Sequence, residues 1–210
     1  NYDLRTYTHD ANGNLLTYIR QLWYNGTWVN SEKDTYTYDT NGNQLTFLNQ
    51  QWDGTQWVNE GRYTSTYDAN GNQLTLLVEN WVDDYYWYNQ NLYTLTYDAN
   101  GNRLTDLNQD WDGISWVNDD LRTYTYDTNG NRLTFLNQDW DGTQWEDDWQ
   151  YTYTYDANGN QLTQLTEYWE EVGSWVDYHL ATYTYDANGN YLTYLTQDWD
   201  GSSWVNNDLY

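Results

Sequence analysis

Short runs in which apolar or aromatic residues alternate with polar ones dominate the chain, and glycine-containing turns separate them. The clearest example holds strand-like runs at Tyr36–Asp39, Gln44–Trp52 and Trp57–Tyr67, with Asn41-Gly42 and Asp53-Gly54 between them. A period of two is typical of β-strands, and Asn-Gly between such runs is a strong hairpin signal. No stretch has the apolar period of a helix. The pattern predicts an all-β chain that folds as a continuous antiparallel meander of about fourteen strands.

The pair Asn-Gly recurs along the whole chain and defines a tandem repeat. It stands at Asn12/Gly13, Asn41/Gly42, Asn70/Gly71, Asn100/Gly101, Asn129/Gly130, Asn158/Gly159 and Asn188/Gly189, with spacings of 29, 29, 30, 29, 29 and 30 residues. A fixed period of this length marks a repeat architecture. Residues 1–210 therefore form a single array of β-hairpin units at 1–29, 30–58, 59–88, 89–117, 118–146, 147–176 and 177–206, followed by the start of a further unit at 207–210.

The spacings themselves recur after 88 residues, so three hairpins form a higher unit. One interpretation is the duplication of a three-repeat block. The other is that three repeats make one superhelical turn, and we expect the meander to coil into a superhelical ribbon, solenoid or tube.

The turn chemistry predicts the pairing within a hairpin. If Asn41 and Gly42 form a two-residue type I′ turn, in which both central residues have positive φ, then Tyr38 faces Leu45. In the same register Thr37 faces Thr46, Tyr36 faces Phe47 and Thr35 faces Leu48. A four-residue second turn would break the phase of a 29-residue unit. We therefore expect a second turn of three or five residues, or a β-bulge in each unit.

The two faces of the predicted sheet differ in how they vary among the units. One face carries Thr46 and Trp52, which recur in every unit, and Leu48, which is replaced only by Ile19 in the first unit, whereas the Phe47 position on the other face varies. The invariant face is the better candidate for burial, and the variable face for solvent or partner contact. The predicted core ladder is Leu48, Trp52, Leu77, Trp81, Leu107, Trp111, Leu136, Trp140, Leu165, Trp169, Leu195 and Trp199.

Composition changes this picture in one respect. A net charge of −25 and a mean hydropathy of −1.08 usually indicate disorder. The 15 Trp and 25 Tyr offset that tendency, because each aromatic side chain can bury about 150–250 Å² and both types favour strands. We expect an aromatic core.

Several function classes are disfavoured by the same composition. The chain has no Cys and therefore no disulfide. It has no apolar run that could insert into a membrane. Seven Lys and Arg against 32 Asp and Glu argue against nucleic acid as a partner. No nucleophile, acid or base constellation breaks the repeat, so we expect no enzymatic activity and no cofactor.

The recurring acidic positions have a structural and a metal-binding interpretation. Asp39 is expected to cap its turn by local hydrogen bonds. The Asp-Gly positions are expected to serve turn chemistry, although a stack of them could present oxygens to Ca²⁺, with candidates Asp53, Asp112, Asp141 and Asp200. Asn25 begins an Asn-Gly-Thr glycosylation pattern. Rows of aromatic residues, including Tyr18, Phe47 and Tyr194, would serve either as structural ladders or as platforms for sugar rings.

The run from Tyr36 to Thr46, YTYDTNGNQLT, resembles the tyrosine-aspartate (YD, or Rhs) repeat, whose core is Y-x-Y-D-x-x-G-(R/N)-x-L-T-like. Similar cores lie at Tyr124–Thr134, Tyr153–Thr163 and Tyr183–Thr193, within a longer unit of about 29 residues. The resemblance implies a long β-ribbon of the kind that spirals into large shells in secreted bacterial toxins and cell-surface proteins.

Together these observations predict a structural, extracellular or cell-surface protein, of bacterial type. It would build a filament, fibre or surface stalk from stacked β-hairpins, with further copies of itself or the continuation of a longer array as its partner. The alternatives are an adhesin-like ribbon that binds glycans and a segment of an Rhs-like shell.

Overall fold

The computed structural model describes residues 2–82, 85–170 and 173–209, and the described residues form strands and turns. The strands are β1 (Asp3–His9), β2 (Leu15–Tyr24), β3 (Thr27–Tyr38), β4 (Gln44–Trp52), β5 (Trp57–Tyr67), β6 (Gln73–Val82), β7 (Tyr86–Tyr97), β8 (Arg103–Trp111), β9 (Trp116–Tyr126), β10 (Arg132–Trp140), β11 (Trp145–Tyr155), β12 (Gln161–Glu170), β13 (Ser174–Tyr185), β14 (Tyr191–Trp199) and β15 (Trp204–Leu209).

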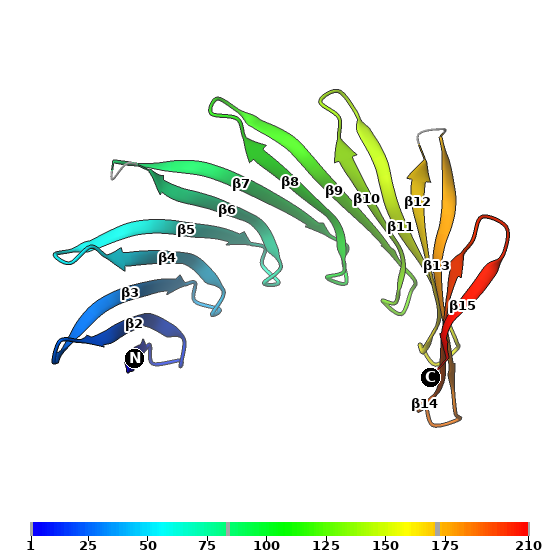
Figure 1. The fold of residues 1–210 in the computed structure, drawn as a ribbon, viewed down its shortest axis with the longest axis horizontal. Coiled ribbons are helices and arrows are strands. Elements are labelled where there is room, and N and C mark those ends of the chain that lie inside the picture. Colours follow the sequence, from blue (N-terminus) through cyan, green and yellow to red (C-terminus); the bar gives the residue numbers. More distant parts are fainter. Residues whose placement is uncertain (1, 83–84, 171–172, 210) are drawn as a thin grey trace. The chain divides into compact units, whose positions relative to one another are not determined.

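The strands follow one another in a single meander sheet in the order β1 to β15 (Figure 1). The predicted all-β hairpin meander is confirmed, with fifteen strands where the pattern predicted about fourteen. The chain divides into two compact units. Unit 1 comprises residues 1–95 and 108–117, and unit 2 comprises residues 96–107 and 118–210.

The edge of the sheet that carries the Asn-Gly pairs, here called the Asn-Gly edge, has one turn geometry throughout. In the turn after β3, the Gly42 amide donates to the Asp39 carbonyl at 3.2 Å, and the Asp39 amide donates to the Asn43 carbonyl at 2.9 Å. Gly42 has φ +88°, whereas Asn41 is not in the positive-φ region. This is a three-residue loop with a type I turn closed by a left-handed glycine.

The predicted type I′ turn is therefore wrong at the Asn-Gly edge. Thr37 lies opposite Thr46, Tyr36 opposite Phe47 and Thr35 opposite Leu48 as predicted, but Tyr38 lies opposite Gln44 and Leu45 is bulged out of the ladder. The physical reason is Asp39, whose carboxylate accepts the Asn41 and Asn43 amides at 2.8 and 2.9 Å and favours a type I turn.

The same correction applies to the other six Asn-Gly pairs. In each of them the glycine amide donates to the carbonyl of the Asp three residues earlier at 3.1–3.2 Å. The glycine has φ between +80° and +91°, whereas the asparagine before it is not in the positive-φ region. The pairs define three-residue loops in place of type I′ turns at Asn12 and Gly13, Asn70 and Gly71, Asn100 and Gly101, Asn129 and Gly130, Asn158 and Gly159, and Asn188 and Gly189.

The type I′ geometry occurs elsewhere, at a site the sequence marked only as a glycosylation pattern. Asn25 has φ +47° and Gly26 has φ +84°, and Tyr24 pairs with Thr27 across them. Among the described non-glycine residues Asn25 alone has positive φ. A two-residue loop with positive φ at both positions is the type I′ hairpin.

The opposite edge, here called the Trp edge, closes through loops of different lengths on a constant pair of tryptophans. Trp52 pairs with Trp57 across four residues, whereas Trp81 pairs with Trp87 and Val82 with Tyr86. A β-bulge follows in the hairpins β2–β3, β4–β5, β6–β7, β10–β11, β12–β13 and β14–β15. In β5 it lies at Glu60, where Asn49 lies opposite Gly61 and Gln50 opposite Asn59. This confirms the bulge among the predicted alternatives. The extra residue of the 30-residue unit lies between Trp81 and Trp87.

The most buried side chains lie on the face that contains Tyr36, Asp34, Phe47 and Asn49, here called the tyrosine face. Among the residues whose burial the structure describes, every buried side chain except Glu79 occupies an equivalent of one of these positions. The most buried of these are Ala181, Tyr153 and Phe135, which are 4–6% exposed. The prediction placed the core on the opposite face, here called the ladder face, which carries Thr46, Leu48 and Trp52. All twelve predicted ladder residues are half-buried there. Large rings on the tyrosine face cover their neighbours, whereas short Thr side chains on the ladder face do not.

Candidate functional site

Regular side-chain pairs cover the ladder face and account for the constancy of its residues. Seven cross-strand Thr pairs, such as Thr37–Thr46, have their hydroxyl oxygens 2.6–2.7 Å apart. Seven Trp pairs, such as Trp52–Trp57, meet edge to face with ring centroids 5.0–5.3 Å apart. Both kinds of pair stabilise antiparallel strands. The predicted ladder is thus a set of structural pairs.

The four calcium candidates lie in the loops of the Trp edge, where their carboxylates serve the loop itself. The Asp53 carboxylate accepts the backbone amides of Thr55 and Gln56 at 2.6 and 2.8 Å, and Asp112, Asp141 and Asp200 make equivalent bonds. These amides lower the pKa of the Asp53 carboxyl. Within the part of the chain that the structure describes, no three His, Asp or Glu residues gather as a metal site would require.

The predicted sugar platforms and the glycosylation candidate lie in different surroundings. The Tyr18, Phe47 and Tyr194 rings pack against cross-strand neighbours, with centroids 5.2–5.5 Å from those of Tyr7, Tyr36, Tyr63 and Tyr183. These contacts favour structural ladders. Asn25 is exposed at the tip of its type I′ turn, so its side chain is open to solvent.

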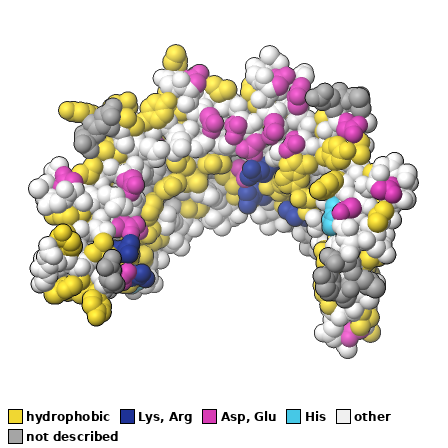
Figure 2. Space-filling model, viewed as in Figure 1, with side chains coloured by type: hydrophobic (Ala, Val, Ile, Leu, Met, Phe, Trp, Pro, Cys, Tyr) yellow, Lys and Arg dark blue, Asp and Glu magenta, His cyan; other side chains and the backbone are white. Residues whose placement is uncertain are grey.

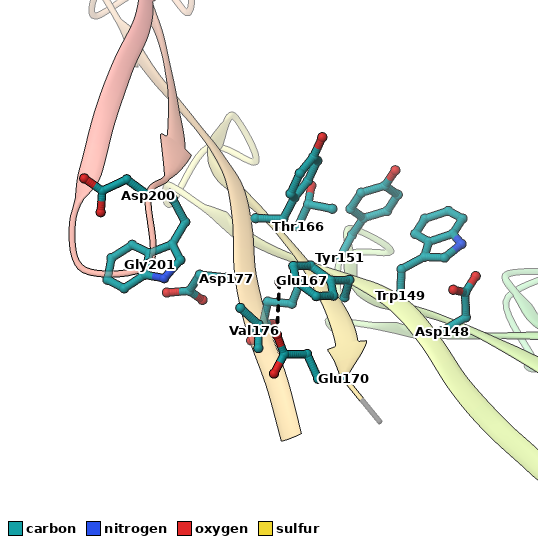
Figure 3. A pocket seen from close by; sticks show the side chains of 13 residues that line it. Asp148, Trp149, Tyr151, Thr166, Glu167, Glu170, Val176, Asp177, Asp200 and Gly201 are labelled. Atoms are coloured by element: carbon teal, nitrogen blue, oxygen red, sulfur yellow. Dashed lines mark hydrogen bonds between the residues drawn. The ribbon is translucent and has the colours of Figure 1, made fainter. Parts of the chain in front are cut away.

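Unit 2 carries a groove of about 950 Å³. It is lined by β11, β12 and β13 and by the loop that follows β14 (Figure 3). Its aromatic lining is Trp149, Tyr151, Tyr168, Tyr178 and Trp199, and its acidic lining is Asp148, Glu167, Glu170, Asp177 and Asp200. Figure 3 shows Asp148 beside Trp149 on β11 and Asp200 on the loop opposite. No cationic side chain is among the lining residues that the structure describes.

Two β-bulges aim side chains into this groove. In β11, Asn137 lies opposite Trp149 and Gln138 opposite Asp147, so Asp148 is the extra residue. In β13, Thr166 lies opposite His179 and Glu167 opposite Asp177, so Tyr178 is the extra residue. A bulge redirects a side chain that a regular strand would send to the other face. Tyr178 thereby meets Tyr168, with ring centroids 6.2 Å apart and planes at 81°.

The groove is the place where the repeat departs from its pattern. At the position of Tyr168 the other units have Leu22, Gln51, Asn80, Asp110, Asp139 and Asp198. At the position of Trp149 they have Asp3, Glu32, Gly61, Asn91, Asp120 and His179. The sequence interpretation missed these residues, although comparison of the units position by position carries the signal, because aromatic side chains replace mostly polar ones.

The electrostatics of the groove depart from the repeat as well. Four other hairpins join a Gln to an Asn or Asp side chain at the corresponding pair, as Gln50 donates to Asn59 at 3.0 Å. In β12 and β13 the pair is Glu167 opposite Asp177, two carboxylates. Burial raises the pKa of the Glu167 carboxyl and Asp177 raises it further, against a hydrogen bond from Gln150 at 2.9 Å. Across the view in Figure 2, Asp and Glu side chains are far more widespread than Lys and Arg.

The phenol of Tyr168 is held at the rim of the groove. Its hydroxyl donates to the Glu170 carboxylate at 3.3 Å. Lost solvent contact and the neighbouring Glu170 raise the pKa of this phenol, so it stays neutral at physiological pH. Tyr168 and Tyr178 are 40% and 60% exposed, which leaves ring surface available to a ligand.

The chain is similar to several solved structures at low sequence identity. No family model and no curated protein matches the chain. A protein of unknown function from Bacteroides fragilis is similar over 58% of this chain and 91% of its own, with 13% identity and a TM-score of 0.48. A porin-like protein from Bacteroides uniformis is similar over 98% and 87%, with 12% identity and a TM-score of 0.43. A Tc holotoxin pore from Photorhabdus luminescens, with a TccC3 mutation, is similar over 97% and 14%, with 16% identity and a TM-score of 0.31. Among the described residues no helix is long and apolar enough to cross a membrane.

Proposed function

We propose that this chain is a structural repeat protein that builds an extracellular filament, fibre or surface stalk by stacking β-hairpins. The observation that carries the proposal is a recurring bond between successive hairpins at the Asn-Gly edge. The Tyr67 hydroxyl donates to the Gln44 carbonyl of the preceding hairpin at 2.9 Å. The equivalent bonds join Tyr38 to Leu15, Tyr155 to Arg132 and Tyr185 to Gln161 at 2.8–3.0 Å.

A second contact repeats beside the first. A Cβ placed on Gly71 would lie 3.4 Å from the Asn43 side chain of the preceding turn, and Gly130, Gly159 and Gly189 have Asn neighbours at 3.6 Å in the same way. Each hairpin thus offers a donor surface on one side and the matching acceptor surface on the other. Such a surface supports head-to-tail growth without a new kind of contact.

The net charge of the chain makes the proposed assembly depend on ionic strength. A net charge of −25 makes like copies repel one another. Raising NaCl from about 0.01 M to about 1 M shortens the Debye length from about 30 Å to about 3 Å. We therefore expect assembly to increase with salt and with protein concentration.

Electron microscopy and light scattering across both series test the proposal. The expected result is particles that lengthen in one dimension. A Thr6→Lys variant places a charge on the exposed strand β1, which is expected to shorten the particles, because charged residues on edge strands oppose pairing. Thr40→Lys makes the same change of charge in an exposed turn and is the control. A monodisperse monomer under all conditions, or equal effects of the two variants, contradicts the proposal.

A further inference from the structure

We propose that the groove on β11, β12 and β13 is a binding site for an organic cation that carries primary ammonium groups. The repeat provides the first argument. Trp149 and Tyr168 occupy positions where no other unit has a Phe, Tyr or Trp. Among the hairpins β2–β3, β4–β5, β6–β7, β10–β11, β12–β13 and β14–β15, Tyr178 is the sole aromatic residue at a bulge. The Trp149 ring also packs on Phe135, with centroids 4.8 Å apart, whereas Tyr168 and Tyr178 leave ring surface exposed. Exposed rings that line a groove are the usual lining of a ligand site.

The aromatic side chains supply two walls. Trp149 and Tyr151 meet at 4.7 Å with an interplanar angle of 67°, and Tyr168 and Tyr178 meet at 6.2 Å and 81°. Near-perpendicular rings present both faces and edges to the space between them. The face of a Trp or Tyr ring attracts an ammonium group placed within about 6 Å of its centroid. Both pairs therefore suit the methylene and ammonium groups of an aliphatic amine.

The carboxylates indicate that the ligand carries positive charge. Asp148, Glu167, Glu170 and Asp177 line the groove, together with Asp200, whose carboxylate also accepts amides of its own loop, and no described cationic residue is among them. The Glu167–Asp177 pair is the informative one, because the pairs at Gln21–Asn30, Gln50–Asn59 and Gln197–Asn206 are neutral amides and Gln138–Asp147 contains one carboxylate. The two opposed carboxylates repel each other when both are ionised, and Asp177 contributes to the raised pKa of Glu167. A bound ammonium group relieves that repulsion, whereas the carboxylates of the lining repel phosphate or sulfate.

The spacing of the carboxylates argues for a distributed cation rather than a metal ion. Among the described residues, no group of three acidic or His side chains converges on one point. Carboxylates spread along a groove of about 950 Å³ instead match several separated positive charges. Two sources carry this chemistry, a flexible linear polyamine and an oligomer of an amino sugar. The ring-stacking walls would bind the second more tightly, because its pyranose faces can also pack on the rings.

Isothermal titration calorimetry of the full chain with matched probes tests the proposal. The probes are spermidine, a glucosamine oligomer and the N-acetylglucosamine oligomer of the same length, which lacks the charges. We expect the glucosamine oligomer or spermidine to bind at low ionic strength, with affinity falling steeply as NaCl rises. Tighter binding of the glucosamine oligomer identifies the amino sugar, and tighter binding of spermidine identifies the polyamine. Equal binding of the N-acetylated oligomer, or no binding of either amine, overturns the proposal.

Variants that restore the pattern of the other units keep the fold while they remove the site. Tyr168→Gln places there the residue found at Gln51, and we expect it to weaken amine binding about tenfold. Glu167→Gln with Asp177→Asn recreates the Gln50–Asn59 pair, and we expect weaker binding with a smaller dependence on salt. Tyr86→Gln, at an exposed residue of β7 in unit 1, is the control and should leave binding unchanged. Undiminished binding by both groove variants contradicts the proposal.

Discussion

The two edges of the sheet close the same strands by different means. At the Asn-Gly edge, backbone hydrogen bonds and one Asp carboxylate fix a single three-residue loop in every described repeat. At the Trp edge, two-residue and four-residue loops lead into the same Trp pair. A backbone-defined turn tolerates no added residue, because each bond depends on a fixed separation along the chain. The pair of Trp side chains at each loop of this edge, here called the Trp clasp, fixes only the two strand ends. The length of the loop beyond it is therefore free to vary.

Removal of the Trp clasp is expected to cause the largest loss of stability at either edge. Trp52→Ala loses an edge-to-face contact with Trp57 at 5.2 Å together with part of a large buried ring surface. We expect a loss of about 2–3 kcal/mol in local stability. Hydrogen exchange measured by mass spectrometry should show faster exchange in β4 and β5 near this edge. Unchanged protection there, with slow exchange retained at the Asn-Gly edge, would show that the clasp is dispensable.

Replacing one glycine at each edge by alanine distinguishes the cost of backbone strain from the cost of a close side-chain contact. Gly71 at the Asn-Gly edge has φ +85° and Gly54 at the Trp edge has φ +104°, so alanine is strained at both. At Gly71 the added Cβ also meets the Asn43 side chain at 3.4 Å, whereas nothing lies within 4 Å at Gly54. We expect losses of about 1–2 kcal/mol for Gly71→Ala and about 1 kcal/mol for Gly54→Ala, measured by urea unfolding. A larger loss at Gly54 would reverse the ranking of the two edges.

The bond between hairpins at the Asn-Gly edge gives a smaller effect. Tyr67→Phe removes the hydroxyl that donates to the Gln44 carbonyl and leaves that acceptor to water. We expect a loss of about 1 kcal/mol, seen as faster amide exchange between β4 and β6. Tyr63→Phe removes a hydroxyl from a ring that is 40% exposed, and this control should change little.

The smallest effect is the response of the turn carboxylates to acid. The Asn43 side chain and then its backbone amide lower the pKa of Asp39, whereas backbone amides of Gln56 and Thr55 lower the pKa of Asp53. Because each folded pKa lies below the ordinary value of 3.8, the stabilisation is present above that pH and is lost as pH falls through the folded pKa. Carbon NMR titration should show Asn43→Ala raising the pKa of Asp39 and leaving that of Asp53 unchanged. Equal shifts would mean that the two edges share one electrostatic environment.

The sequence predicted the repeat, the hairpins and most of the pairing because these depend on local signals. Thr37 opposite Thr46 follows from where the turn lies, and the bulge follows from the parity of the unit. The turn type was wrong because Asp39 acts on the backbone from outside the Asn-Gly pair. The buried face was also misassigned. Constancy at Leu48 and Trp52 reflects specific pairing, which does not require full burial.

The groove was the least predictable feature, for a related reason. Tyr178 reaches Tyr168 because a bulge redirects it, and the alternation of a regular strand gives no sign of this. The pairing of Glu167 with Asp177 likewise depends on the shifted register beyond that bulge. Residues whose role rests on one irregular step in a strand are visible in sequence only as departures from the other repeats.

The variable loops of the Trp edge also lie at regular intervals along the sheet. Neighbouring strands lie about 4.8 Å apart, so successive loops on one edge follow at intervals of about 10 Å. Asp53-Gly54 and its equivalents sit outside the Trp clasp, where a grafted peptide would leave the ladder bonds intact. A binding epitope placed in chosen loops of unit 1 or of unit 2 would be displayed at multiples of that interval. The number of hairpins in that unit would set the number of epitopes displayed.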